Sequence, residues 1–173
     1  IPLIHGADGA KLSKRHGALG VEAYRDDMGI LPDALFNYLL RLGWGYGDKE
    51  VISRAEAIDL FDLSGVGKSP ARFDLKKLQN LNGLYIRDTD DARLAVLAAE
   101  RIGPQADTAL LEQAMPALKT RAKDINELAD GAAFLFQSRP LNLTEKAAAL
   151  LDDDARALLA QVSARLQSGI DWT

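Results

Sequence analysis

The chain has 173 residues, 47% of them hydrophobic, which is enough for one or two compact domains of about 100 to 150 residues each. Cysteine is absent and only two histidines occur, so disulfides and thiolate or histidine metal cages are excluded. The net charge of −4 argues against binding polyanions by bulk charge, and no apolar run approaches the roughly 20 residues that cross a bilayer, so a soluble protein is expected.

Residues 1–20 are glycine-rich and predict a loop around at most a short strand. Within them, Lys11 and Lys14 bracket Ser13 in a glycine-flanked stretch. Glycines allow the backbone to approach phosphate oxygens, and a mobile ammonium can follow the negative charge on a leaving pyrophosphate. Composition alone favours an exposed linker over a phosphate-binding loop.

The next segments have helical spacing. Pro32 suits the first turn of a helix over 33–42, and Gly43 follows where a C-cap glycine would stand. Ser53 and Glu56 have capping-box spacing ahead of a second helix.

Ser69-Pro70 predicts an N-cap and a helix-starting proline, and Asn82-Gly83 predicts a stop or sharp turn. From Lys68 to Arg87, five basic residues and a single acid, Asp74, give a local charge of +4. Such a stretch fits localised contact with a nucleic-acid backbone, although a solvated helix face is also consistent with it.

From Asp90 onward the chain is rich in Ala and Leu, and helical apolar spacing recurs in four segments. Asp124 and Thr144 predict two of the helix starts, and Gly103-Pro104 predicts a short break. We therefore expect a mainly α multi-helix bundle. The four segments are 90–102, 107–121, 124–137 and 144–168.

Beyond these patterns, the chain resembles the class I aminoacyl-tRNA synthetases, and within them the bacterial glutamyl enzymes. Lys11-Leu12-Ser13-Lys14-Arg15 is similar to their second signature, Lys-Met-Ser-Lys-Ser. Further matches follow in the family's order over roughly half the chain: Arg15-His16-Gly17-Ala18, Val21-Glu22-Ala23-Tyr24-Arg25, Leu35-Phe36-Asn37-Tyr38-Leu39, Leu42-Gly43-Trp44, Lys68-Ser69-Pro70-Ala71, Phe73-Asp74-Leu75-Lys76-Lys77-Leu78 and Leu81-Asn82-Gly83 with Tyr85-Ile86-Arg87.

The resemblance implies that Lys14 contacts ATP, with Lys11 as the second catalytic lysine and Ser13 and Arg15 supporting the ATP site. It implies glutamate and tRNA(Glu) as the other substrates, with Mg²⁺ in the full enzyme and no metal site in this piece. The candidate tRNA phosphate contacts are Lys68, Arg72, Lys76 and Lys77.

The resemblance also implies three segments: the ATP-loop segment 1–20, a helical stem-contact domain 21–89, and the first part of a helical anticodon-binding domain 90–173. The first class I signature, His-x-Gly-His, is absent. We therefore expect a C-terminal piece of a cytoplasmic, monomeric ligase that charges no tRNA alone.

Two other interpretations stay open. In the first, the chain is a helical protein-interaction module, and its basic stretch is only a solvent-exposed surface. In the second, it is a piece of the related glutaminyl enzyme, whose chain continues into β-barrels. Aromatic residues are too few for a row of base-stacking platforms, and we interpret Trp44, Tyr46 and Phe73 as core or hinge packing.

Overall fold

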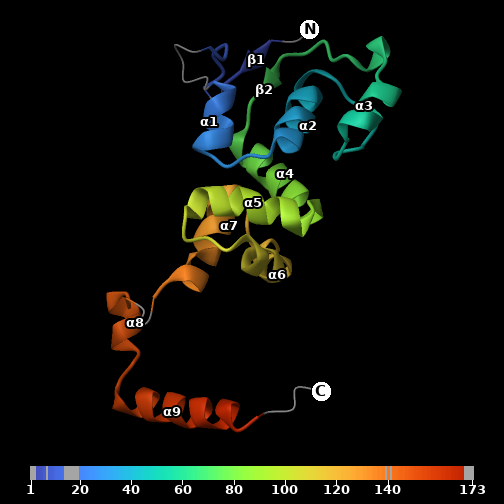
Figure 1. Ribbon diagram of the computed structural model, residues 1–173. Coiled ribbons are helices and arrows are strands. Elements are labelled where there is room, and N and C mark those ends of the chain that lie inside the picture. Colours follow the sequence, from blue (N-terminus) through green and yellow to red (C-terminus); the bar gives the residue numbers. More distant parts are fainter. Residues whose placement is uncertain (1–2, 7, 14–19, 139, 141, 170–173) are drawn as a thin grey trace. The chain divides into compact units, whose positions relative to one another are not determined.

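The computed structural model describes residues 3–6, 8–13, 20–138, 140 and 142–169. The chain divides into two compact units, Ile1–Phe136 and Gln137–Thr173. The described residues are mainly helical, with one small parallel sheet, so the predicted fold class is confirmed (Figure 1). The predicted segment boundaries at residues 20 and 89 stay a prediction.

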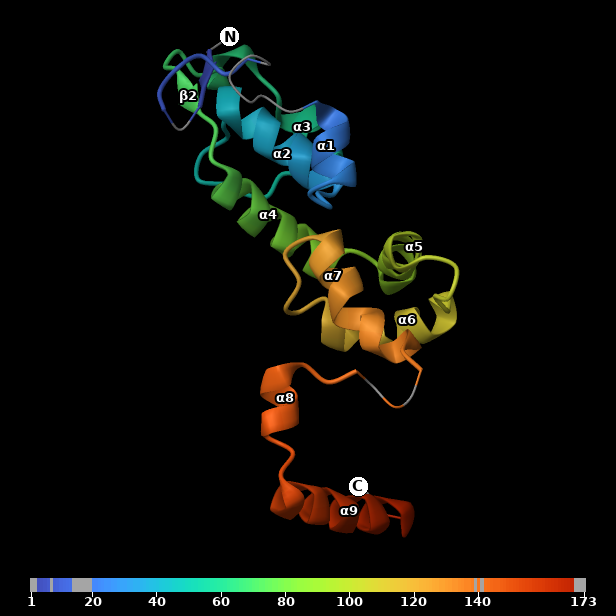
Figure 2. The same cartoon turned by 90° about the vertical axis from the view of Figure 1, so that its left-hand side faces the viewer.

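The first unit begins with strand β1 (Ile4–His5), helix α1 (Val21–Asp26), helix α2 (Pro32–Gly43) and helix α3 (Arg54–Leu60). Strand β2, helices α4 to α7 and two 3-10 helices follow, and Figure 2 shows α5, α6 and α7 gathered at the end of α4. These elements are the 3-10 helix Leu63–Gly65, β2 (Ala71–Arg72), α4 (Leu75–Asp88), α5 (Asp91–Ile102), α6 (Thr108–Leu118), α7 (Ile125–Ala132) and the 3-10 helix Ala133–Phe136.

The second unit contains α8 (Glu145–Ala149) and α9 (Asp153–Gln167). The sequence predicts one helical segment over 144–168, and this is wrong at residues 150–152. There the side chain of Asp152 accepts a hydrogen bond from the amide of Ala155 at 2.8 Å and starts a new helix. An acidic N-cap followed by two more acids favours a helix start over continuation.

The core of the first unit is one continuous cluster that joins α2, α4, α5, α6 and α7. Its fully buried members include Leu78, Ile86, Leu94, Leu111 and Leu128. Burial of such side chains stabilises the fold by roughly 1.5 to 3 kcal/mol each. The cluster contains residues on both sides of position 90, so α4 packs as part of the same body as α5 and α7.

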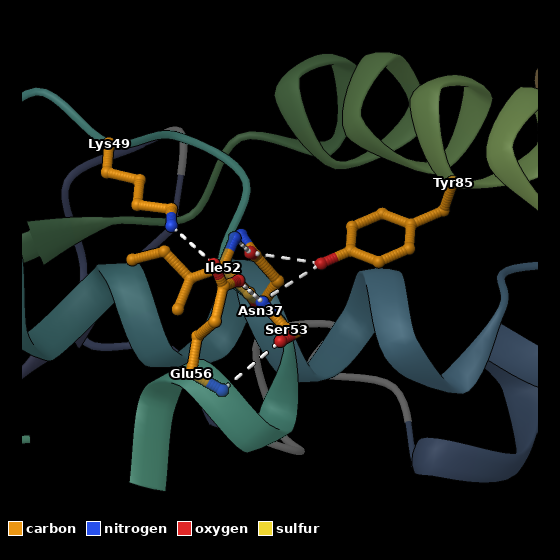
Figure 3. A network of polar contacts seen from close by, with 6 residues as sticks. All are labelled: Asn37, Lys49, Ile52, Ser53, Glu56 and Tyr85. Atoms are coloured by element: carbon orange, nitrogen blue, oxygen red, sulfur yellow. Dashed lines mark hydrogen bonds and ion pairs between the residues drawn. The ribbon is translucent and has the colours of Figure 1, made fainter. Parts of the chain in front are cut away.

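Helix α3 is held to this body by a buried amide, shown in Figure 3. The side chain of Asn37 accepts hydrogen bonds from the amide of Ile52 and from the Tyr85 hydroxyl, and donates to the Glu50 carbonyl at 3.0 Å. The predicted capping box of α3 is confirmed, because Ser53 and Glu56 hydrogen-bond to each other's backbone amides.

Three local predictions are corrected in this unit. Pro70 starts no helix, because Ala71–Arg72 is drawn into the sheet and α4 begins after the N-cap Asp74. Asn82-Gly83 is no turn, because α4 runs through both residues to Asp88. Gly43 is not the C-cap of α2 but its last helical residue, and the C-cap is Trp44.

The reason for the second correction is tertiary. Asn82 is fully buried, and its side chain accepts from the amide of Leu31 at 2.8 Å and donates to the carbonyl of Lys123 at 2.7 Å. A Cβ on Gly83 would lie 3.6 Å from the Cα of Lys123. The pair is therefore the docking point of two linkers on α4, because the Asn82 amide bonds to both of them and Gly83 packs against one.

Candidate nucleic-acid interface

A cationic groove of about 630 Å³ lies on the first unit. It is bounded by α2, β2, α4 and the linker before α7. Its lining includes Glu50 as an acid and five cations, so its formal charge is strongly positive. The cations are Arg41, Arg72, Lys77, Arg87 and Lys123.

Helix α4 contributes a stripe of side chains to the groove. Lys77, Asn80, Leu84 and Arg87 all line it, and they follow one another at intervals of three, four and three residues. This spacing puts them on one face of a helix. Lys76 is displaced by one residue, about 100° around the helix, and lies outside the described lining.

The remaining cations come from parts of the chain far from α4 in sequence. Arg41 stands in the last turn of α2 and is paired with Glu50 at 3.8 Å, but both side chains are too exposed for this pair to be strong. Lys123 is placed by its backbone, because its carbonyl accepts from Asn82 and its amide donates to Glu127 at 2.8 Å.

The structure brings together two of the four predicted tRNA contacts. Arg72 and Lys77 line the groove, whereas Lys68 and Lys76 are exposed outside its described lining. The sequence placed Arg87 in the basic stretch but not among the tRNA contacts, and it gave no indication of Arg41 and Lys123. No local pattern could have indicated them, since only the folding of α2 and of the α6–α7 linker onto α4 brings them near.

The lysine signature begins on the small sheet. Strands β1 and β2 are parallel, with Ile4 opposite Ala71 and His5 opposite Arg72. The chain then folds back, so that the backbone of Lys11 pairs with that of His5 in an antiparallel β-bridge. The amide of Leu12 donates to the Ile4 carbonyl at 2.8 Å.

Of the four predicted ATP residues, two can be placed. Lys11 is exposed and Ser13 is half-buried, whereas Lys14 and Arg15 lie outside the described residues. The backbone of Lys11 is therefore fixed by its pairing with β1, while its exposed side chain is accessible to an anionic ligand.

Arg72 belongs to both regions. It lines the groove, and a Cβ on Gly9 would lie 3.9 Å from one of its guanidinium nitrogens. Gly9 has a φ of 79°, which side chains rarely adopt, so the turn before the signature approaches Arg72 as bare backbone. The arrangement can bind a polyanion in the groove and a second phosphate-bearing ligand beside it.

No three His, Cys, Asp or Glu side chains gather as a metal site within the described ranges. In the same part of the chain, no helix combines the length and apolar character required to span a membrane.

Two family descriptions match the chain. Residues 1–80 match "tRNA synthetases class I (E and Q), catalytic domain", and residues 93–173 match "Anticodon binding domain".

Curated relatives match the chain over its whole length. It is 69% identical to glutamate–tRNA ligase 1 of Erythrobacter litoralis over 173 residues and 63% identical to glutamate–tRNA ligase 2 of Rhizorhabdus wittichii over 180 residues. All of this chain is covered in both cases, and the chain spans 36% and 38% of the length of these relatives.

A solved structure shares the fold as well. The glutamate tRNA ligase of Elizabethkingia meningosepticum, in complex with its amino acid, superposes with a TM-score of 0.77 at 26% identity. The superposition covers 98% of this chain and 38% of that chain.

Proposed function

Because the chain belongs to the class I tRNA synthetase family of the glutamate and glutamine enzymes, we propose that it is part of a glutamate–tRNA ligase. In that reaction the glutamate carboxylate attacks the α-phosphate of ATP, pyrophosphate leaves, and the acyl group passes from the adenylate to a ribose hydroxyl of tRNA(Glu). The glutamyl enzyme is favoured over the glutaminyl one, because the relatives compared above are named for glutamate. We place the longer protein in the cytoplasm.

In this proposal the signature lysines serve the first step. Lys14 stabilises the charge that builds on the phosphates as pyrophosphate leaves, and Lys11, Ser13 and Arg15 support it. The anchored position of Lys11 beside β1 supports this role. Mg²⁺ would accompany the ATP phosphates and supply further charge neutralisation.

The cationic groove carries the tRNA part of the proposal. Five cations and one acid line a space of about 630 Å³ on the body that also supports the lysine signature. Phosphate contacts position a nucleic acid on a protein, and they are made mainly by Arg and Lys. We assign the backbone of tRNA(Glu) to this groove.

Salt-dependent tRNA binding tests the groove. Each cation that contacts a phosphate contributes about 1 to the slope of log K against log salt, so Arg72→Ala with Lys77→Ala should lower the slope by about 2. The matched control is Lys68→Ala with Lys76→Ala, which removes the same charge outside the described lining. Equal losses in both double variants would show that the groove is not the site.

The ATP part is tested in a chimaera in which this chain replaces the matching part of the Erythrobacter litoralis relative. Lys14→Ala should reduce the charging rate by about 10² to 10³-fold, as removal of a transition-state donor does elsewhere. An unchanged rate would refute the assignment. The chain by itself should show no glutamate-dependent ATP–pyrophosphate exchange.

A further inference from the structure

Phe73 contacts both described flanks of residues 14–19. The first flank is the hydrogen-bonded segment that starts at β1 and carries Lys11 and Ser13. The backbone amide of Phe73 donates to the carbonyl of His5 at 2.8 Å and so extends the ladder between β1 and β2. This bond ties the first flank to the start of α4.

The second flank is α1, which begins at Val21. The ring of Phe73 lies against Tyr24 of this helix, with the ring centroids 6.0 Å apart and the planes at 54°. The same ring meets the edge of Tyr38 of α2 at 5.3 Å and 81°. Aromatic pairs at such distances and angles are favourable beyond their burial.

The backbone next to Phe73 is held by several hydrogen bonds. The hydroxyl of Tyr38 accepts from the amide of Asp74 at 2.6 Å and donates to its carbonyl at 3.0 Å. Asp74 is the N-cap of α4, and its side chain accepts from the amide of Lys77 at 3.2 Å. The residue after Phe73 is therefore bonded to two helices.

The far end of α1 has a separate support. The guanidinium of Arg101 donates to the carbonyls of Asp26 and Arg25 at 2.7 and 2.6 Å, and the side chain of Asn126 donates to the carbonyl of Asp27 at 2.9 Å. Loss of the Phe73 ring would leave these bonds in place. The change would then fall on the end of α1 that is nearer to the signature.

We propose that Phe73 is a positioning residue of the ATP loop. Its backbone holds the flank that carries Lys11, and its ring holds the flank that starts α1, so it sets the relative position of both supports. The inference rests on the proposed role of Lys11 and Lys14 toward ATP. Fixed supports pre-organise a catalytic group, whereas a displacement of about 1 Å can cost on the order of 10²-fold in rate.

The test uses the chimaeric ligase described above and charging rates at saturating tRNA and glutamate, with ATP varied. Phe73→Leu retains the backbone bond and most of the apolar volume but removes the ring contacts. We expect kcat/KM for ATP to fall about tenfold, with the tRNA dissociation constant unchanged within twofold. Tyr24→Leu, which removes the same contact from the other side, should reproduce the loss.

The matched control is Phe136→Leu, because Phe136 is a half-buried ring on the same core, in the 3-10 helix Ala133–Phe136. It should lower the melting temperature comparably and leave kcat/KM for ATP intact. Equal losses of activity in both phenylalanine variants, or full activity in folded Phe73→Leu and Tyr24→Leu, would overturn the inference. If Phe73→Leu fails to fold, Tyr24→Leu alone decides.

The two proposals fail separately. Full activity of Lys14→Ala would refute the ATP role itself, and the inference with it. Loss of activity in Lys14→Ala together with full activity in Phe73→Leu and Tyr24→Leu would refute only the positioning role.

Discussion

The units 1–136 and 137–173 are both built from capped helices, but they differ in how much of their apolar surface is buried. Helices in both begin at side-chain caps, with Asp124 capping α7 and Asp152 capping α9. The first unit surrounds a buried cluster, whereas the described residues of the second are all exposed or half-buried. On α9, Leu158, Leu159 and Val162 are 46% to 61% exposed.

The comparison separates what forms a helix from what stabilises it. Capping satisfies amides at the first turn and acts locally, so both units show it. Packing needs partners from elsewhere in the chain, and most helical stability comes from packing because isolated helices shorter than about 12 to 15 residues are marginal in water. The predictions below test this difference, from the largest effect to the smallest.

Core truncation should separate the units most strongly. Ile86→Ala removes a fully buried side chain and should reduce the free energy of unfolding by about 3 to 4 kcal/mol. Leu159→Ala, at a position that is 53% exposed, should change it by less than about 0.5 kcal/mol. Urea unfolding measures both, followed by Trp44 fluorescence in a Trp172→Phe background for the first unit and by far-UV circular dichroism for the helices of the second, and similar losses would contradict the comparison.

The buried amide of Asn82 gives the next effect. Asn82→Ala leaves the Leu31 amide and the Lys123 carbonyl without their partner and should cost about 2 to 3 kcal/mol. Asn142→Ala, at an exposed position in the second unit, is the control and should cost less than about 0.5 kcal/mol. Because the bond to Lys123 also places a groove cation, Asn82→Ala should weaken tRNA binding in the same protein.

Removing a helix cap should have different consequences in the two units. Ser53→Ala removes the cap of α3 and should cost about 1 kcal/mol in the unfolding of the first unit. Asp152→Ala should instead lower the helix content of α9 and leave the Trp44 transition where it was. Hydrogen exchange at the α9 amides measures the loss of helix, and Trp44 fluorescence measures the unfolding of the first unit. A shifted Trp44 transition in Asp152→Ala would contradict the prediction.

The pH dependence of two caps is the smallest effect. Hydrogen bonds from Lys49 and Ser53 lower the pKa of Glu56 to about 2. Its contribution to stability is full above the ordinary carboxyl pKa of 4.5 and is lost as the pH falls toward 2. Glu56→Gln should therefore melt below the parent at pH 6 and approach it near pH 2.

Asp124 has the opposite sign, because burial raises its pKa. Its contribution is present at low pH and is lost as the pH rises through the folded-state pKa. Asp124→Asn keeps a capping oxygen, so its melting temperature should improve relative to the parent as the pH rises. Parallel curves for both variants and the parent would show that neither carboxyl contributes.

Local rules predicted the helices well where the signal was local. The caps Ser53, Asp124 and Thr144 all start helices as expected. The errors at Pro70 and Asn82-Gly83 have a common cause, since in both cases a distant segment docks on the residues: β1 on Ala71–Arg72, and the linker at Lys123 on α4. Turn chemistry at an Asn-Gly pair is overridden when the amide has buried backbone partners.

The candidate site divides in the same way. The basic stretch of the sequence contains Arg72, Lys77 and Arg87, which line the groove, but it also contains Lys68 and Lys76, which do not. Adjacent residues of a helix point in different directions, so Lys77 lines the groove and Lys76 does not. The sequence allows this distinction once α4 is known to start at Leu75. Arg41 and Lys123 carried no such signal.

By itself, then, the sequence determined where most helices begin, the family to which the chain belongs and the order of its motifs, because these depend on neighbouring residues. The tertiary structure alone decided that α4 continues through Asn82, that five cations from separate segments share one groove, and that Phe73 contacts both flanks of the signature. The physical reason is that these features arise from contacts between residues tens of positions apart, which no local spacing encodes.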